Sequence, residues 1–115
     1  MELFFYKLFN MISQTPPPPY CAVIFTSIRT EGDHGYAQMA DRMVELARQQ
    51  DGFLGVESAR NEIGITVSYW RDLECIRKWR ENMEHSVARD KGRKEWYKSF
   101  KVRIAKVERD YGFEN

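Results

Sequence analysis

The sequence predicts a single α+β domain in which four strands and two helices follow one another as strand, helix, strand, strand, helix, strand. Three observations support this order. Residues 20–29 and 63–70 are rich in β-branched and aromatic side chains, apolar residues recur at helical spacing through 36–47, and two apolar segments are separated only by Asn61-Glu62. The length of 115 residues suits one domain, although a domain of this size buries only a moderate fraction of its surface when it folds alone.

The first strand is expected over Tyr20–Arg29 and the turn EGDHG follows it at residues 31–35. Asp33 is expected to cap a helix that ends around Gln50, before the stop signal Asp51-Gly52. The apolar positions of this helix recur every three or four residues. They are Tyr36, Met39, Ala40, Met43, Leu46 and Ala47.

Two strands are expected over Phe53–Arg60 and Ile63–Trp70. Side chains of the second strand alternate between an aliphatic face and a mixed polar and aromatic face. The aliphatic face holds Ile65, Val67 and Tyr69, and the mixed face holds Thr66, Ser68 and Trp70. A strand of this kind is suited to separate a core from a ligand pocket.

Asp72 is expected to cap the second helix. Its apolar stripe comprises Leu73, Ile76, Trp79, the aliphatic stem of Arg80, and Met83. Helix is expected to continue with interruptions through residues 86–97, with a kink or junction at Gly92. The alternating segment Phe100–Val107 is the predicted last strand.

This order of elements defines a ferredoxin-like βαββαβ fold, a four-stranded antiparallel sheet with both helices on one face. The other face needs a cover, because an exposed apolar sheet face of this size promotes aggregation. A homodimer in which two sheets meet as a dimeric α+β barrel is the expected cover.

Residues 1–19 are expected to form an N-terminal extension and a proline-rich arm, and residues 20–113 the domain. Lys7 and Asn10 interrupt the apolar start, no cleavage site follows, and the stretch is shorter than the roughly 20 apolar residues that span a bilayer. We therefore expect a cytoplasmic protein with no membrane segment. Because Met11 could itself start translation, residues 1–10 are hypothesised to be dispensable.

The charge of the chain is nearly balanced but unevenly placed. The formal net charge is +1, yet residues 71–109 hold 13 Lys and Arg against 7 Asp and Glu. We favour a solvated helix surface for this basic part, with an anionic ligand as the alternative, and we expect no nucleic-acid partner. Cys21 and Cys75 have neither a CxxC partner nor a nearby Cys/His cluster, so both are interpreted as buried thiols and no metal site is expected.

Three segments together resemble the antibiotic biosynthesis monooxygenase family over about Tyr20 to Phe113. They are AVIFTSIRTEGDHGYAQMADRMVELARQQDGFLGVESAR, SYWRD at residues 68–72, and EHSVARDKGRKEWYKSFKVRIAKVERDYGF. The resemblance implies the dimeric barrel fold and a spread of chemistries. Some members oxidise aromatic polyketides or quinols without metal or flavin, some degrade haem, and many have no known activity.

For a cofactor-free oxygenase, the resemblance implies a small aromatic, phenolic or quinol-type substrate that is deprotonated and then reacts with dioxygen in a dry pocket. His85 is the candidate base, with a solvent-facing histidine as the alternative. The candidate substrate-binding residues are Trp79, Trp70, Tyr69 and Phe25, for which plain core is the alternative, and Arg103, which either clamps an anion or meets solvent.

Haem degradation is the second reading of the resemblance, because members of that branch carry a Trp followed by a His ligand. Trp79 matches the Trp, but Arg89 occupies the position expected for the His, and Phe25, Thr26 and Ser27 stand where that branch has an Asn. We therefore expect no cofactor, with haem as the alternative. A non-catalytic dimer that binds a small ligand is the third reading.

Overall fold

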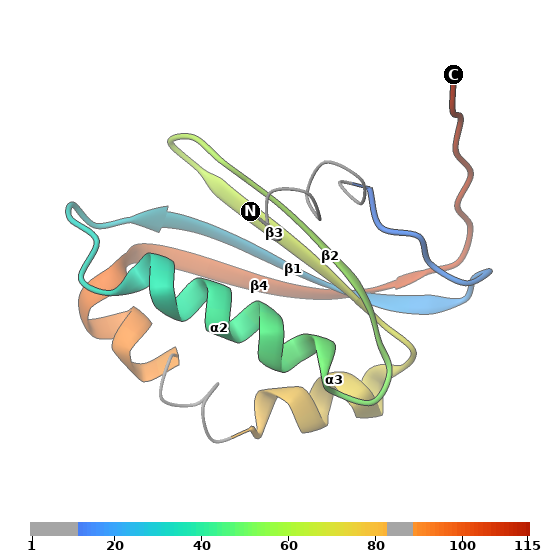
Figure 1. Ribbon diagram of the computed structural model, residues 1–115, viewed down its shortest axis with the longest axis horizontal. Coiled ribbons are helices and arrows are strands. Elements are labelled where there is room, and N and C mark those ends of the chain that lie inside the picture. Colours follow the sequence, from blue (N-terminus) through green and yellow to red (C-terminus); the bar gives the residue numbers. More distant parts are fainter. Residues whose placement is uncertain (1–11, 83–88) are drawn as a thin grey trace.

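The computed structural model describes residues 12–82 and 89–115. Along the chain lie β1 (Tyr20–Arg29), α2 (Tyr36–Arg48), β2 (Phe53–Arg60), β3 (Gly64–Trp70), α3 (Leu73–Arg80), the π-helical turn η1 (Gly92–Trp96) and β4 (Tyr97–Val107). The strands form one antiparallel sheet in the spatial order β2-β3-β1-β4. Helices α2 and α3 lie on one side of the sheet, and the C-terminal tail rises on the other (Figure 1). The predicted ferredoxin-like α+β fold is confirmed.

Strand β1 lies between β3 and β4, so its register fixes which side chains share a face. Cys21 is opposite Trp70 of β3, and Phe25 is opposite both Thr66 of β3 and Val102 of β4. Directly opposed residues of antiparallel strands point to the same side of a sheet. The mixed polar and aromatic face of β3 therefore looks at the helices, and its aliphatic face is the open face.

The hydrophobic core lies between the helices and the end of the sheet where β1 begins. Its buried members are Cys21, Ala47, Trp70, Cys75, Ile76 and Trp79, with Val23, Met43, Leu46 and Phe53 packed against them. Both cysteines are free and buried, which confirms their interpretation as buried thiols. None of the helices in the described ranges is long and apolar enough to cross a membrane.

Helix α2 follows β1 after the loop at residues 30–35. The N-cap residue is Gly35, in the left-handed conformation with φ 82°, and not Asp33 as predicted. The Asp33 carboxylate nevertheless accepts hydrogen bonds from the backbone N–H groups of Gly35, at 3.1 Å, and Ala37, at 3.2 Å. Asp33 therefore satisfies first-turn donors from two residues upstream, because a glycine can adopt the left-handed cap. The helix ends at Arg48, two residues before the predicted end.

Helix α3 begins at its predicted cap. The Asp72 carboxylate accepts a hydrogen bond from the backbone N–H of Cys75 at 2.9 Å. Cys75, Ile76 and Trp79 form the buried face, whereas Leu73 is 62% exposed and was wrongly placed in the apolar stripe. Leu73 follows the cap directly, where the helix still lies beyond the edge of the core.

The segment before the last strand differs from the prediction. Residues Gly92–Trp96 form a π-helical turn, and β4 begins at Tyr97, three residues earlier than predicted. The Trp96 indole N–H donates to the His34 carbonyl at 2.9 Å, and the Trp96 carbonyl accepts from the backbone N–H of Thr30 at 2.9 Å. These tertiary bonds bury Trp96 beside the end of β1 and start strand pairing at Tyr97.

The arm and the tail cover one end of the open face. The Ser13 backbone N–H donates to Glu57 at 2.9 Å, and the Ser13 hydroxyl donates to the Val56 carbonyl at 3.3 Å. From the tail, Asp110 accepts a hydrogen bond from the Tyr20 hydroxyl at 2.5 Å. Further along this face, Ile65 is 45% exposed. The single chain therefore leaves part of its open face uncovered.

Candidate functional site

Two of the predicted substrate-binding residues lie together in the core. The rings of Trp70 and Trp79 stack with their centroids 5.8 Å apart and an interplanar angle of 26°. Trp70 is 0% exposed and Trp79 is 9% exposed, and the Trp70 indole N–H donates to the Ser68 hydroxyl at 2.9 Å. Such burial is what a core role requires, so a ligand contact stays a prediction for both residues.

A second aromatic cluster occupies the other end of the same side of the sheet. Phe25 stacks on Phe100 with centroids 5.4 Å apart, and Tyr97 meets Phe25 edge to face at 5.3 Å. Tyr36 of α2 packs edge to face on Tyr97 at 5.8 Å. Burial, together with the hydrogen bond between the Tyr36 and Tyr97 hydroxyl groups, raises the pKa of Tyr97. The Tyr97 phenol is therefore neutral at physiological pH.

Two residues of this surface were not predicted from the sequence as site residues. Val102 is opposite Phe25 and Ile104 is opposite Val23 in the pairing of β1 with β4, so both point to the helix side. They are nevertheless 44% and 43% exposed. We call Phe25, Phe100, Val102 and Ile104 the apolar strip. It is an aliphatic and aromatic surface on the helix side of the sheet that the described helices leave half open, and a flat apolar ligand could lie against it.

Cationic side chains border the aromatic cluster. The Arg93 guanidinium lies 6.0 Å from the Phe100 ring centroid, and the Arg29 guanidinium lies 3.6 Å from the Tyr36 ring centroid. Arg29 also donates to the Trp96 carbonyl at 3.0 Å and so joins α2 to the start of β4. Positive charge at these positions favours an electron-rich ring or a phenolate nearby.

A third arginine is built into the sheet beside this cluster. The Arg60 guanidinium donates to the hydroxyl of Ser27, which is buried at 2% exposure. It lies directly over Gly64, where an added Cβ would come within 2.1 Å of the guanidinium carbon. Glycine is therefore required at position 64 for Arg60 to reach Ser27.

A separate cavity of about 490 Å³ lies at the C-terminal end of α3. Its described lining residues are Arg77, Arg80, Glu81 and Arg89. This cavity is basic, whereas the apolar strip is not.

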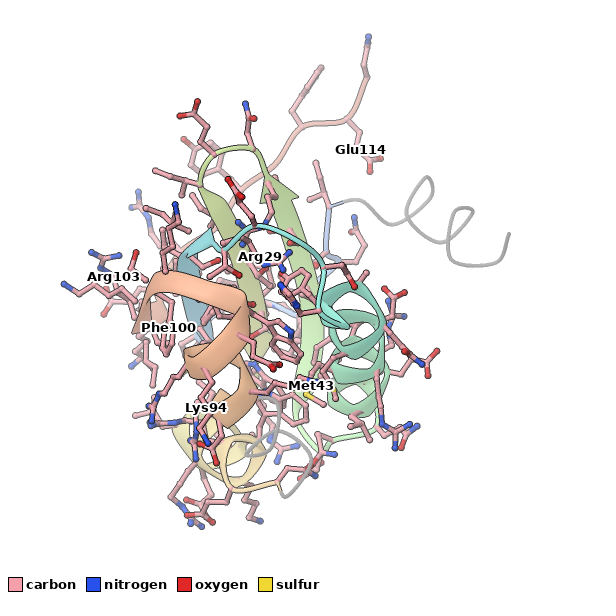
Figure 2. All side chains as sticks on the ribbon, turned by 90° about the vertical axis from the view of Figure 1, so that its left-hand side faces the viewer. Arg29, Met43, Lys94, Phe100, Arg103 and Glu114 are labelled. Carbon is pink, nitrogen blue, oxygen red and sulfur yellow. The ribbon has the colours of Figure 1, made fainter. Side chains whose placement is uncertain are left out.

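The remaining predicted substrate-binding residues lie on the open face. Arg103 is opposite Ile24 of β1, and its exposed side chain projects outward from the molecule, whereas Met43 lies in the interior (Figure 2). The Tyr69 hydroxyl donates to Glu57 at 2.6 Å, and burial, followed by that carboxylate, raises the pKa of Tyr69. The structure therefore separates Tyr69 and Arg103 from Phe25 and Trp79 by the thickness of the sheet.

His85, the candidate base, lies outside the described residues, so its role stays a prediction. In residues 12–82 and 89–115, His, Cys, Asp and Glu side chains form no cluster of three or more that could hold a metal ion.

The donor set does not fit haem ligation at the position that the family resemblance indicates. Arg89 stands there, and an arginine guanidinium has no lone pair to offer to iron. The Trp79 indole is stacked on Trp70, which leaves little of it accessible to a macrocycle.

Comparison with known proteins identifies the class. The model of the family described as antibiotic biosynthesis monooxygenase matches residues 19–91. The chain therefore belongs to the antibiotic biosynthesis monooxygenase family. It is 51% identical over 109 residues to "Uncharacterized protein YqjZ" of Bacillus subtilis (strain 168), a match that covers 93% of this chain and 96% of the relative.

Solved structures agree with this fold. SnoaB, described as a cofactor-independent oxygenase from Streptomyces nogalater, is similar with a TM-score of 0.66 at 9% identity, over 85% of this chain and 100% of that chain. Rv0793 from Mycobacterium tuberculosis is similar with a TM-score of 0.69 at 13% identity, over 82% of this chain and 99% of that chain. At such low identity these likenesses show the fold alone.

Proposed function

We propose that this protein is a cofactor-independent monooxygenase that uses dioxygen to oxidise a small phenolic or quinol-type aromatic substrate. The observation that carries the proposal is the apolar strip, an aromatic and aliphatic surface left half open on the helix side of the sheet in a member of a monooxygenase family. The description of SnoaB as a cofactor-independent oxygenase supports the same chemistry.

The reaction can proceed without an external reductant. A phenol loses a proton, its electron-rich anion transfers electrons to dioxygen, and one oxygen atom becomes a second ring carbonyl. The other oxygen atom leaves as water with the two hydrogens that the substrate gives up, so phenol and dioxygen yield quinone and water. The protein has to bind the ring, remove the proton and exclude water.

The strip provides the binding surface in this proposal. A ring stacked near Phe25 and Phe100 would gain apolar contact from Val102 and Ile104. The Arg93 guanidinium, already close to the Phe100 ring, would stabilise the phenolate relative to the phenol. His85 is proposed as the base that accepts the phenolic proton.

Oxygen consumption with a panel of phenols, quinols and anthrones tests the proposal. Val102→Asp places a negative charge on the strip and should lower kcat/KM by about tenfold or more. The new carboxylate would repel the substrate phenolate and so disfavour its formation. Ile63→Asp is the matched control, because Ile63 is a 53% exposed aliphatic residue just before β3. Turnover that survives Val102→Asp would remove the strip from the site, and no oxygen uptake with any substrate would favour a non-catalytic ligand-binding protein.

The base is tested with the two histidines of the chain. His85→Ala should lower kcat and remove the acidic limb of its pH profile, because only the neutral imidazole accepts a proton. His34→Ala is the control, since His34 lies in the turn before α2 with φ 51°. Equal turnover of the two variants, at unchanged melting temperature, would exclude His85 as the base.

We also propose that the protein is a cytoplasmic homodimer whose open sheet faces meet. The exposed Ile65, with Val67 and Ile24 beside it in register, gives that face an apolar centre. Ile65→Lys should therefore give a monomer in light scattering, while Leu73→Lys, on the exposed start of α3, should leave the dimer intact. A wild-type monomer at micromolar concentration would refute the dimer.

A further inference from the structure

The basic cavity at the end of α3 contains more positive than negative charge. Of its four described lining residues, three are arginines and one is Glu81. Arg77 lies in the last turn of α3 and Glu81 is the C-cap residue of that helix, and Arg89 reaches the same cavity from the segment that precedes η1. The chain as a whole has a formal net charge of only +1, so the positive charge here is a local feature.

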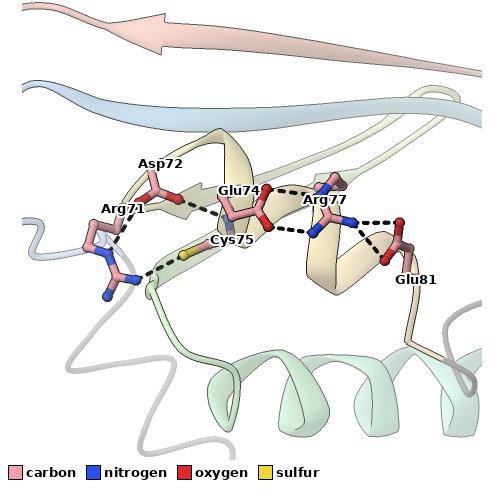
Figure 3. Close-up of polar contacts among 6 residues, drawn as sticks. All are labelled: Arg71, Asp72, Glu74, Cys75, Arg77 and Glu81. Atoms are coloured by element: carbon pink, nitrogen blue, oxygen red, sulfur yellow. Dashed lines mark hydrogen bonds and ion pairs between the residues drawn. The ribbon is translucent and has the colours of Figure 1, made fainter.

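One of the three arginines is already neutralised. Arg77 is held between two carboxylates, with hydrogen bonds to Glu74 on one side and to Glu81 at 2.8 and 3.0 Å on the other (Figure 3). Glu81, which lines the cavity, and Glu74, one turn before Arg77, are therefore both engaged with Arg77. Arg77 therefore shapes the wall of the cavity and adds no net charge to it.

Arg80 and Arg89 are the two arginines of the cavity that no carboxylate of the described residues pairs with. Among those residues, the Nε atom of Arg89 is buried without a hydrogen-bond partner. A buried polar N–H without a partner is unfavourable, and two guanidinium groups that line one cavity repel each other. An anion in the cavity would relieve both costs.

We propose that this cavity binds the oxyanion group of a small ligand, a carboxylate or a phosphate, through Arg80 and Arg89. The guanidinium fork matches the paired oxygens of either group and donates two parallel hydrogen bonds to it. The Glu81 carboxylate lines the same wall and repels negative charge, so the site favours small anions. The volume of about 490 Å³ accommodates a small molecule.

Isothermal titration calorimetry at low ionic strength and pH 7 tests the proposal, with inorganic phosphate and malonate as separate probes. Both should bind saturably, and the tighter of the two identifies the preferred oxyanion. Arg80→Gln and Arg89→Gln should each weaken binding by about tenfold or more, since each removes a charge-assisted bidentate contact. Lys101→Gln, a change of an exposed cation on β4, should leave affinity unchanged.

Two further variants separate a built site from general electrostatic attraction. Glu81→Gln should tighten binding several-fold, because it removes the negative charge from the wall and frees Arg77. Arg89→Lys keeps the charge but loses the fork, so its affinity should fall between those of wild type and Arg89→Gln.

The outcomes are decisive in either direction. Absence of saturable binding of both probes, equal affinity of the Arg80→Gln and Lys101→Gln variants, or weaker binding by Glu81→Gln would overturn the anion site. Arg80 is exposed, so Arg80→Gln is expected to fold even where Arg89→Gln does not. Because the readout is binding, failure of the proposed oxygenase activity leaves this test unaffected.

Discussion

The Trp79 indole of α3 stacks on the fully buried Trp70 indole of β3, with ring centroids 5.8 Å apart. This pair joins α3 to the end of β3, an inner strand of the sheet. Phe53 of β2 meets the Trp70 ring edge to face at 5.4 Å, so three elements depend on one indole. A ligand that displaced Trp79 would have to open the core.

Truncation of Trp79 should therefore act on stability before it acts on binding. Trp79→Ala is expected to lower the free energy of unfolding by about 3–5 kcal/mol, the usual cost of removing a buried aromatic ring. Trp79→Phe should cost less, because it retains a ring that can stack on Trp70. Urea unfolding followed by circular dichroism measures both. If Trp79→Ala keeps wild-type stability, the ring is not part of the core.

Glycine is required at position 52, in the turn between α2 and β2. Its φ is +84°, and an added Cβ would lie 2.3 Å from the Cys75 sulfur. Gly52→Ala should therefore cost about 2–5 kcal/mol, since backbone strain and overpacking both oppose the methyl group. Gly35→Ala is the matched control, because Gly35 has φ +82° but open space around its Cβ position, and it should show strain alone, about 1–3 kcal/mol. Equal melting temperatures of the two variants would refute the clash with Cys75.

Titration with haemin should give no stoichiometric Soret shift. Arg89 stands at the position where the resemblance places the axial ligand, and an arginine guanidinium has no lone pair to donate to iron. Any weak association should leave the Soret band stable when ascorbate is added. Stoichiometric binding followed by ascorbate-dependent loss of the band would instead establish haem degradation.

Much of the fold follows from local sequence signals. Asp72 caps α3 because its carboxylate reaches an N–H only three residues ahead, and such a contact is readable from the sequence alone. The β-branched and aromatic content of residues 20–29 and the alternation of residues 63–70 likewise predict strands, and the structure has both. The order of these elements then leaves few arrangements besides a four-stranded antiparallel sheet.

The candidate site was harder to predict because it depends on register between distant segments. The alternation of β4 shows that Val102 and Ile104 share a face, but only the pairing with β1 shows that this face is turned to the helices. The same pairing places Arg103 on the open side. The role of Trp96 in fixing where β4 begins was likewise not predicted, since its hydrogen bond to His34 spans 62 positions.

Alkaline pH should destabilise the protein through its buried phenols. Burial, followed by the Glu57 carboxylate, raises the pKa of Tyr69, so the folded state keeps a proton that the unfolded chain releases near pH 10. The stability that Tyr69 contributes is therefore fully present below about pH 10 and is lost as pH rises further.

The free energy of unfolding, measured by urea titration between about pH 8 and pH 11, should accordingly fall more steeply in wild type than in Tyr69→Phe. Tyr111→Phe is the control, because Tyr111 is 96% exposed and its side chain is not buried on folding. If Tyr69→Phe and Tyr111→Phe show the same slope as wild type, Tyr69 ionises alike in the folded and unfolded states. The hydrogen bond to Glu57 would then have no effect on the ionisation of Tyr69 in solution.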